Sequence, residues 1–218
     1  MGKFGLSQPV RRTEDPKFLK GHGRYVDDIV LPGLTHACVV RSPHAHARIN
    51  KIDTTAAKNA PGVLLVLTLA DYKEAGLGAL PSIIPGVPNF GPDKVYAPDR
   101  YPLTSDVARF VGDGIAFVVA ETLSQARDAA ELVAVDYEPL PVIASTRDAT
   151  RPGSAQVWPD CPENISYRYE LGNGTDTDAA FTKADKIAMG EFLISRVSAN
   201  SLEARGLLAD YDARADFH

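Results

Sequence analysis

The chain has 218 residues, and its 23 lysines and arginines against 28 aspartates and glutamates give a formal net charge of −5. Hydrophobic residues make up 44% and charged residues 23%, which is ordinary for a globular protein. The acidic balance argues against a general nucleic-acid binder, because such a protein needs a basic surface for phosphates. The sequence has neither an apolar run near the roughly 18 residues of a membrane helix nor an apolar signal segment at its start. We therefore expect no membrane partner and a cytoplasmic location.

Cysteine usage is low. The two cysteines, Cys38 and Cys161, cannot make a disulfide framework, a four-cysteine zinc site or an iron–sulfur site. Because Cys38 lies in an apolar run, it is predicted to be a core thiol.

The first part of the chain alternates strands with short helices. In order, the sequence predicts an extended arm or a set of turns over residues 1–28, strands over 34–41 and 48–52, a helix over 54–59, a buried strand over 63–67 and a helix over 69–75. Asp53 and Thr68 are predicted to cap the two helices, and Gly76 to end the second.

Residues 76–102 hold six prolines and four glycines, a density that leaves no room for a regular element. A long irregular loop is predicted there. Loops of this length inside compact domains are more often functional or interface-forming than idle, so this loop is expected to lie against another part of a larger protein.

Regular structure is predicted to resume after the loop. Strands over residues 106–111 and 115–120 are expected to form a hairpin through Gly112 and Asp113. A helix over 123–132, capped by Thr122, and a strand over 133–137 follow. Residues 145–175 are predicted to be a polar linker, followed by a helix over 176–184 and strands over 186–196 and 207–212. The order of elements predicts an α+β domain over about residues 20–145.

Several groups of residues invite a functional interpretation. His44 and His46 could share one face as metal ligands, but a structural role is the weightier interpretation. The Gly-Asp-Gly run at residues 112–114 could form an anion nest, although a plain turn is favoured. Glu203 could orient the guanidinium of Arg205 toward a phosphate or carboxylate, or the two could form only a surface ion pair.

Eight runs together resemble one family, the molybdenum-binding large subunits of xanthine dehydrogenases, aldehyde oxidases and aerobic carbon monoxide dehydrogenases. Three of them are short, residues 31–33 (Leu-Pro-Gly), 52–54 (Ile-Asp-Thr) and 61–63 (Pro-Gly-Val), and the other five are called the motif runs. The motif runs are residues 21–28 (Gly-His-Gly-Arg-Tyr-Val-Asp-Asp), 40–49 (Val-Arg-Ser-Pro-His-Ala-His-Ala-Arg-Ile), 111–113 (Val-Gly-Asp), 135–141 (Val-Asp-Tyr-Glu-Pro-Leu-Pro) and 200–206 (Asn-Ser-Leu-Glu-Ala-Arg-Gly). The second and fourth runs are long enough to be specific.

The resemblance implies an α+β fold with an α/β hammerhead domain. Its expected organisation is an N-terminal arm over residues 1–19, the hammerhead over 20–145, a linker over 146–163, and the start of a molybdopterin-binding domain over 164–218. It also implies an enzyme that uses molybdopterin and passes electrons to partner subunits carrying iron–sulfur clusters and FAD. The family's glycine-rich cofactor loop and catalytic glutamate lie beyond residue 218, so the resemblance implies no catalytic residue in this chain.

Two functions follow as expectations. The first is the N-terminal fragment of a molybdenum hydroxylase-type oxidoreductase. This fragment alone is expected to bind no cofactor and to be inactive, and Glu203 and Arg205 are expected to support the cofactor domain without contacting the cofactor. The alternative is a non-catalytic hammerhead scaffold that mediates subunit assembly. The substrate, whether an aldehyde, an N-heterocycle or carbon monoxide, cannot be read from these residues.

Overall fold

The computed structural model describes residues 11–81, 95–168, 171–195, 197–201, 203, 205–211 and 214. The chain divides into two compact units. The central unit is Thr35–Ile187, and the terminal unit joins Met1–Leu34 with Ala188–His218. No helix among the described residues is long and apolar enough to cross a lipid bilayer.

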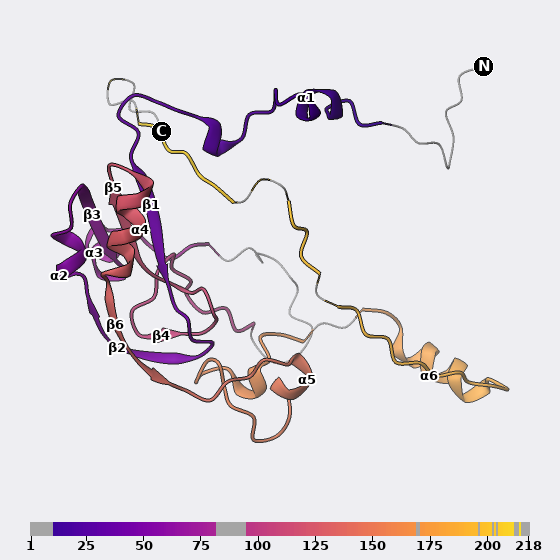
Figure 1. Ribbon diagram of the computed structural model, residues 1–218. Helices are drawn as coiled ribbons and strands as arrows, with labels where there is room; N and C mark the ends of the chain where they lie inside the picture. The colour runs from indigo at the N-terminus through magenta and orange to yellow at the C-terminus, as the bar shows by residue number, and fades with distance from the viewer. Residues whose placement is uncertain are drawn as a thin grey trace, which may run out of the picture. The chain divides into compact units, whose positions relative to one another are not determined.

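Two three-stranded antiparallel sheets form the framework of the central unit (Figure 1). The first sheet has the order β1 (His36–Arg41), β5 (Gly114–Ala120) and β3 (Val63–Thr68). The second has the order β4 (Val107–Ala108), β2 (Ala47–Asp53) and β6 (Ala134–Pro139). The mixture of sheets and helices confirms the predicted α+β class.

Helices cover the first sheet and complete the central unit. The helix α4 (Leu123–Glu131) lies against β1, β5 and β3, as Figure 1 shows. The other helices of the unit are α2 (Thr55–Lys58), α3 (Leu69–Glu74), α5 (Thr146–Ala149), the 3-10 turn η2 (Pro162–Asn164) and α6 (Gly174–Lys183). The terminal unit contains α1 (Asp15–Leu19) and the 3-10 turn η1 (Val26–Asp28).

The core of the central unit centres on β5, whose residues alternate between two apolar clusters. Ala116 and Val118 pack with Val66 and with Ala129 of α4. Ile115, on the other face of the strand, packs with residues of β2 and β4. Half-buried residues of β1, β2 and β6 contact both clusters, so the two sheets share one continuous core.

Two of the three predicted helix caps, Thr68 and Thr122, are confirmed. Oγ1 of Thr122 accepts a hydrogen bond from the backbone N–H of Gln125 at the start of α4. Thr68 and Asp71 cap α3 reciprocally, since Oδ2 of Asp71 accepts from the backbone N–H of Thr68 at 2.7 Å. The third prediction is wrong, because the N-cap position of α2 is Thr54; Asp53 lies one residue earlier, and its Oδ1 accepts from the backbone N–H of Thr55 at 3.0 Å. Each cap satisfies first-turn amides that have no partner within the helix.

The predicted hairpin over residues 106–120 is wrong. The strand β4 is only two residues long and pairs with β2, whereas β5 pairs with β1 and β3. Gly112 does adopt a left-handed conformation, with φ of +95°. The turn therefore exists, but it carries the chain from one sheet to the other rather than back along the same sheet.

The strand β3 is less buried than predicted. It lies at the edge of its sheet, and a register shift between Val63 and Leu65 interrupts the alternation of its side chains. Leu64 and Leu65 are consequently both exposed, and Val66 alone is fully buried. The prediction for the cysteines is also corrected: Cys38 is half-buried, and Cys161 is the buried thiol.

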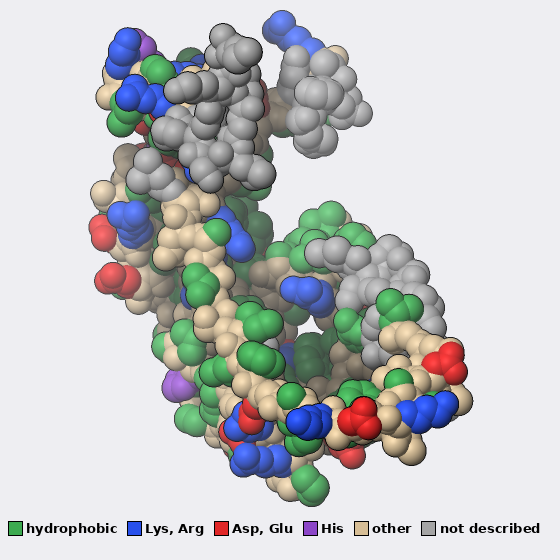
Figure 2. Space-filling model, turned by 90° about the vertical axis from the view of Figure 1, so that its right-hand side faces the viewer, with side chains coloured by type: hydrophobic (Ala, Val, Ile, Leu, Met, Phe, Trp, Pro, Cys, Tyr) green, Lys and Arg blue, Asp and Glu red, His purple; other side chains and the backbone are tan. Residues whose placement is uncertain are grey.

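The strands predicted over residues 186–196 and 207–212 do not form within the described residues there. A strand needs a neighbouring strand to hydrogen-bond its backbone, and sequence periodicity alone does not supply one. Phe192, Leu193 and Ile194 are each at least 90% exposed. Hydrophobic side chains are also visible across the face shown in Figure 2.

The loop predicted over residues 76–102 has no helix in its described residues, and its ends meet where Leu80 and Arg100 form an isolated antiparallel bridge. Residues 82–94 lie outside the described part. The segment predicted as a linker does contain regular turns, α5 and η2.

Candidate functional site: the junction of the sequence motifs

The two histidines of the second motif run lie against the fourth motif run. The ring of His44 is tilted over that of Tyr137, with centroids 4.8 Å apart. Nδ1 of His46 lies 2.7 Å from the carbonyl oxygen of Pro141, and the backbone N–H of Leu140 donates to the carbonyl oxygen of His46 at 2.9 Å. These contacts support the structural interpretation of both histidines.

Ser42 also belongs to the second motif run and joins that run to the third. The residue is almost fully buried, at 2% exposure. Its backbone N–H donates to the carbonyl oxygen of Asp113 at 2.8 Å, and its carbonyl oxygen accepts from the N–H of Gly112 at 2.8 Å. The guanidinium of Arg41 also donates to the carbonyl oxygen of Gly112, at 2.8 Å. The hydroxyl of Ser42 accepts from the backbone N–H of His44 at 3.1 Å. Three runs that are far apart in the sequence thus meet at one junction.

These bonds also decide the anion-nest interpretation of the Gly-Asp-Gly run. The N–H of Gly112 is bound to Ser42, and the N–H of Asp113 donates to the carbonyl oxygen of Phe110 at 3.2 Å. Amides that already have acceptors cannot also hold an anion. The turn interpretation is therefore correct.

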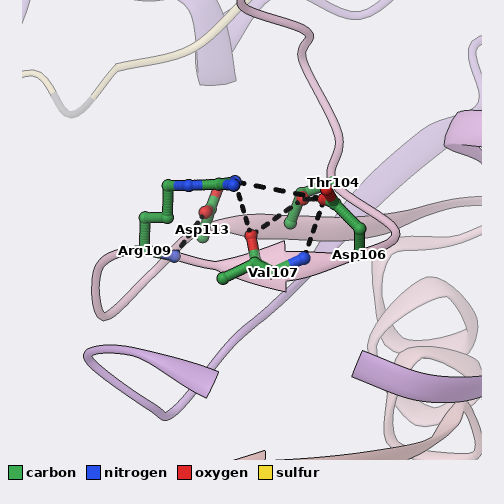
Figure 3. A network of polar contacts seen from close by, with 5 residues as sticks. All are labelled: Thr104, Asp106, Val107, Arg109 and Asp113. Carbon is green, nitrogen blue, oxygen red and sulfur yellow. Dashed lines mark hydrogen bonds and ion pairs between the residues drawn. The ribbon is translucent and has the colours of Figure 1, made fainter. Parts of the chain in front are cut away.

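A polar network lies beside the junction and is drawn in Figure 3. The guanidinium of Arg109 donates to the carbonyl oxygen of Val107 at 3.1 Å and lies 4.0 Å from the carboxylate of Asp106. The hydroxyl of Thr104 bonds to both Asp106 and Val107 at 3.1 Å. The backbone N–H of Arg109 donates to the carboxylate of Asp113 at 3.1 Å.

Burial sets the electrostatics of two junction residues. Burial raises the pKa of the Asp113 carboxyl, against the opposing effect of the hydrogen bond from the Arg109 amide. Burial also raises the pKa of the Tyr137 hydroxyl. In both residues desolvation of the charged form is the dominant cause.

Sequence reasoning missed the role of Arg109. Its guanidinium carbon lies 3.6 Å from the centroid of the Trp158 ring, and its side chain is only 15% exposed. Tyr96 meets the same indole edge-on, with ring centroids 6.3 Å apart. Trp158 is the single tryptophan of the chain, set in a polar, proline-rich stretch that was assigned to a linker. A single tryptophan in such a polar stretch is the sequence feature that could have indicated this packing contact.

Further hydrogen bonds hold the Trp158 segment in place. The backbone N–H of Tyr96 donates to the carbonyl oxygen of Ser166 at 2.8 Å, and the hydroxyl of Ser166 donates back to the carbonyl oxygen of Tyr96 at 2.7 Å. The amide side chain of Asn164 bonds to the backbone of Ala149, Ala155 and Val157 at 2.8–2.9 Å. Residues 149–166 are therefore tied to each other and to the chain that leads into β4.

Glu203 and Arg205 lie in the terminal unit, and both are exposed. Within the described residues no ion pair joins them. Oε1 of Glu203 instead accepts a hydrogen bond from the backbone N–H of Val26 at 2.9 Å, so it binds the first motif run. Asp28 caps its own turn by accepting from the N–H of Tyr25 at 2.9 Å.

The described part of the chain has no group of three or more histidine, cysteine, aspartate or glutamate side chains that could hold a metal ion. The carboxylate of Glu203 is bound to a backbone amide. The junction side chains bind mainly to backbone atoms, so they hold segments of the chain in position.

Comparison with known proteins identifies the fold of the central unit. Residues 20–141 match the family described as aldehyde oxidase and xanthine dehydrogenase, a/b hammerhead domain. The chain belongs to this family. Its relatives are large subunits of xanthine dehydrogenase, aldehyde oxidase and carbon monoxide dehydrogenase type. The hammerhead assignment made from the motif runs is therefore confirmed.

Two curated relatives and one solved structure show how much of a family member the chain represents. It is 36% identical to the carbon monoxide dehydrogenase large chain of Afipia carboxidovorans, over 95% of this chain and 26% of the relative. It is 38% identical to the nicotine 6-hydroxylase large subunit of Paenarthrobacter nicotinovorans, over 97% of this chain and 25% of the relative. A crystal structure of Cu,Mo-CO dehydrogenase is similar with a TM-score of 0.66 and 37% identity, covering 84% of this chain and 23% of that one. This chain spans about a quarter of the length of these relatives.

Proposed function

We propose that the chain serves as the N-terminal portion of the molybdopterin-binding large subunit of a molybdenum hydroxylase-type oxidoreductase, and that it is inactive alone. The observation that supports this most is its coverage: almost all of the chain aligns with about a quarter of each curated relative. The enzyme would hydroxylate an aldehyde or an N-heterocycle with oxygen from water, or oxidise carbon monoxide.

The remaining assignments follow from the same proposal. Residues 164–218 begin a molybdopterin-binding domain, and Glu203 and Arg205 support that domain without touching the reacting atoms. The partners are the rest of the large subunit, an iron–sulfur subunit and an FAD subunit, in the cytoplasm. Two cysteines cannot hold the iron–sulfur clusters, which supports their placement on a partner.

Metal content and turnover test the proposal. The 218-residue chain is purified from a host that makes molybdopterin, and molybdenum is measured by elemental analysis. Dye reduction is then measured with aldehydes, purines and carbon monoxide against a heat-killed control. We expect neither stoichiometric molybdenum nor turnover, while a full-length related large subunit with its partners, prepared in parallel, shows both. Stoichiometric molybdenum or turnover in the short chain would overturn the proposal.

A second function rests on a separate observation. The central unit has its own continuous core, so a free hammerhead domain could act as a scaffold that brings partner subunits together. The reading frame downstream of the codon for His218 separates the two functions. A frame that continues into a glycine-rich loop supports the enzyme portion, and a stop codon in an expressed gene supports the scaffold.

A further inference from the structure

One contact in the terminal unit joins segments from opposite parts of the chain. The backbone N–H of Val26 donates to Oε1 of Glu203 at 2.9 Å, across a separation of 177 residues. Gly206 approaches the same residue from the same segment, because a Cβ added to it would lie 3.2 Å from Cγ1 of Val26. The hydrogen bond from Glu203 and the close approach of Gly206 therefore both involve Val26, a residue of the first motif run.

The turn that begins at Val26 needs an acceptor from outside itself. The first amides of a helical turn have no partner within the turn. Asp28 supplies an acceptor for the N–H of Tyr25, and the carbonyl oxygen of Val26 accepts from the N–H of Ile29. The N–H of Val26 is satisfied by Glu203. A carboxylate forms a stronger hydrogen bond to an amide than a neutral acceptor does.

The glycine at position 206 is explained by the same contact. Its backbone does not adopt a positive φ, so conformational freedom is not what requires glycine there. An added Cβ would lie 3.2 Å from Cγ1 and 3.3 Å from Cβ of Val26. Carbon atoms in favourable contact are about 3.5–4.0 Å apart, so any side chain at position 206 would push the two segments apart.

We propose that Glu203 is a positioning residue that holds the returning chain against η1 (Val26–Asp28). Residues 11–34 and the segment around residues 203–206 then form one discontinuous piece, and residues 35–187 are an insertion between its two parts. The partner of Glu203 is the backbone of η1 rather than the neighbouring Arg205. This role also gives the first and fifth motif runs a shared purpose, because each supplies one side of the contact.

The contact has a consequence for a complete large subunit. It would fix the position of Glu203 and Gly206, within the segment 164–218 assigned to the molybdopterin-binding domain, relative to η1, and this consequence rests on the proposed function. The contact itself does not rest on it, since it involves only residues of this chain.

Hydrogen exchange at one amide tests the proposal in the full 218-residue chain. We expect Glu203→Ala to lower the protection of the Val26 amide about tenfold, measured by NMR. Glu203→Gln keeps a carbonyl acceptor and is expected to retain most of the protection. Asp210→Asn, which neutralises an exposed carboxylate of the same segment, is the matched control and is expected to change nothing.

A second pair of variants tests the apolar half of the contact. Gly206→Val is expected to lower the protection of the same amide, whereas Gly78→Val adds equal bulk where a Cβ meets nothing within 4 Å and is expected to have no effect. Unchanged protection in Glu203→Ala, or an equal loss in Asp210→Asn, would overturn the inference. Either result would leave the proposed function untouched, because that function is tested by molybdenum content and turnover.

Discussion

Replacing Val66 with aspartate should unfold the central unit. Val66 is 2% exposed and packs against Val118 of β5 and Ala129 of α4. Truncation to alanine removes two methyl groups, worth about 0.8 kcal/mol each, and leaves a cavity, so Val66→Ala should cost about 2 kcal/mol. Aspartate adds the burial of a carboxyl group without a partner, which costs several kcal/mol more.

That sum is comparable to the whole stability of a domain, which is about 5–15 kcal/mol. We therefore expect Val66→Asp to lose its cooperative transition in thermal and urea unfolding followed by circular dichroism. Val66→Ala is expected to keep the transition, with Tm lowered by roughly 5–8 °C.

Leu64 provides a matched control on the same strand. Its side chain is 54% exposed, so Leu64→Asp places the same carboxyl group in water and should change the free energy of unfolding by less than about 1 kcal/mol. A Val66→Asp protein with a transition near that of the wild type would refute the core assignment. Equal damage from Leu64→Asp would refute the assignment of faces on β3.

Three further predictions concern side chains that hold segments together. Arg109→Lys keeps the charge but loses planar stacking, so we expect a red shift in the fluorescence of Trp158 and a loss of roughly 0.5–2 kcal/mol. Asn164→Ala removes three hydrogen bonds of about 1 kcal/mol each, and trypsin should then cut residues 146–166 faster. The hydroxyl of Thr68 lowers the pKa of Asp71, so this carboxylate stabilises the fold above pH about 4 and the gain is lost on acidification. Asp71→Asn should show a smaller loss of stability in urea melts as the pH falls from 7 toward 3.

What the sequence revealed was mostly local. The caps at Thr68 and Thr122 were predictable because a side chain and an amide three residues apart decide them. The pairing of β4 with β2 was not predictable from the sequence, because strand neighbours are set by the whole sheet rather than by the turn between β4 and β5. The irregular register of β3 was equally hidden, since no residue type in an all-apolar run marks where a register shift falls.

The candidate site shows the same division. The motif runs supply the residues of the junction, but the partners of those residues lie far away in the chain. His46 meets Pro141 across 95 positions, and Val26 meets Glu203 across 177. Arg109 and Trp158 belong to no run and emerged only from the fold. Sequence patterns identify groups able to make contacts, and the fold decides which contacts they make.

The junction also engages the polar side chains of the second motif run in contacts within the protein. Ser42, Arg41 and His46 spend their polar atoms on backbone partners, and His44 and Tyr137 face each other. A side chain bound to the backbone of another segment fixes the distance and register between segments whatever side chains that segment carries. The second, third and fourth motif runs therefore hold β1, β5 and β6 in fixed positions relative to one another.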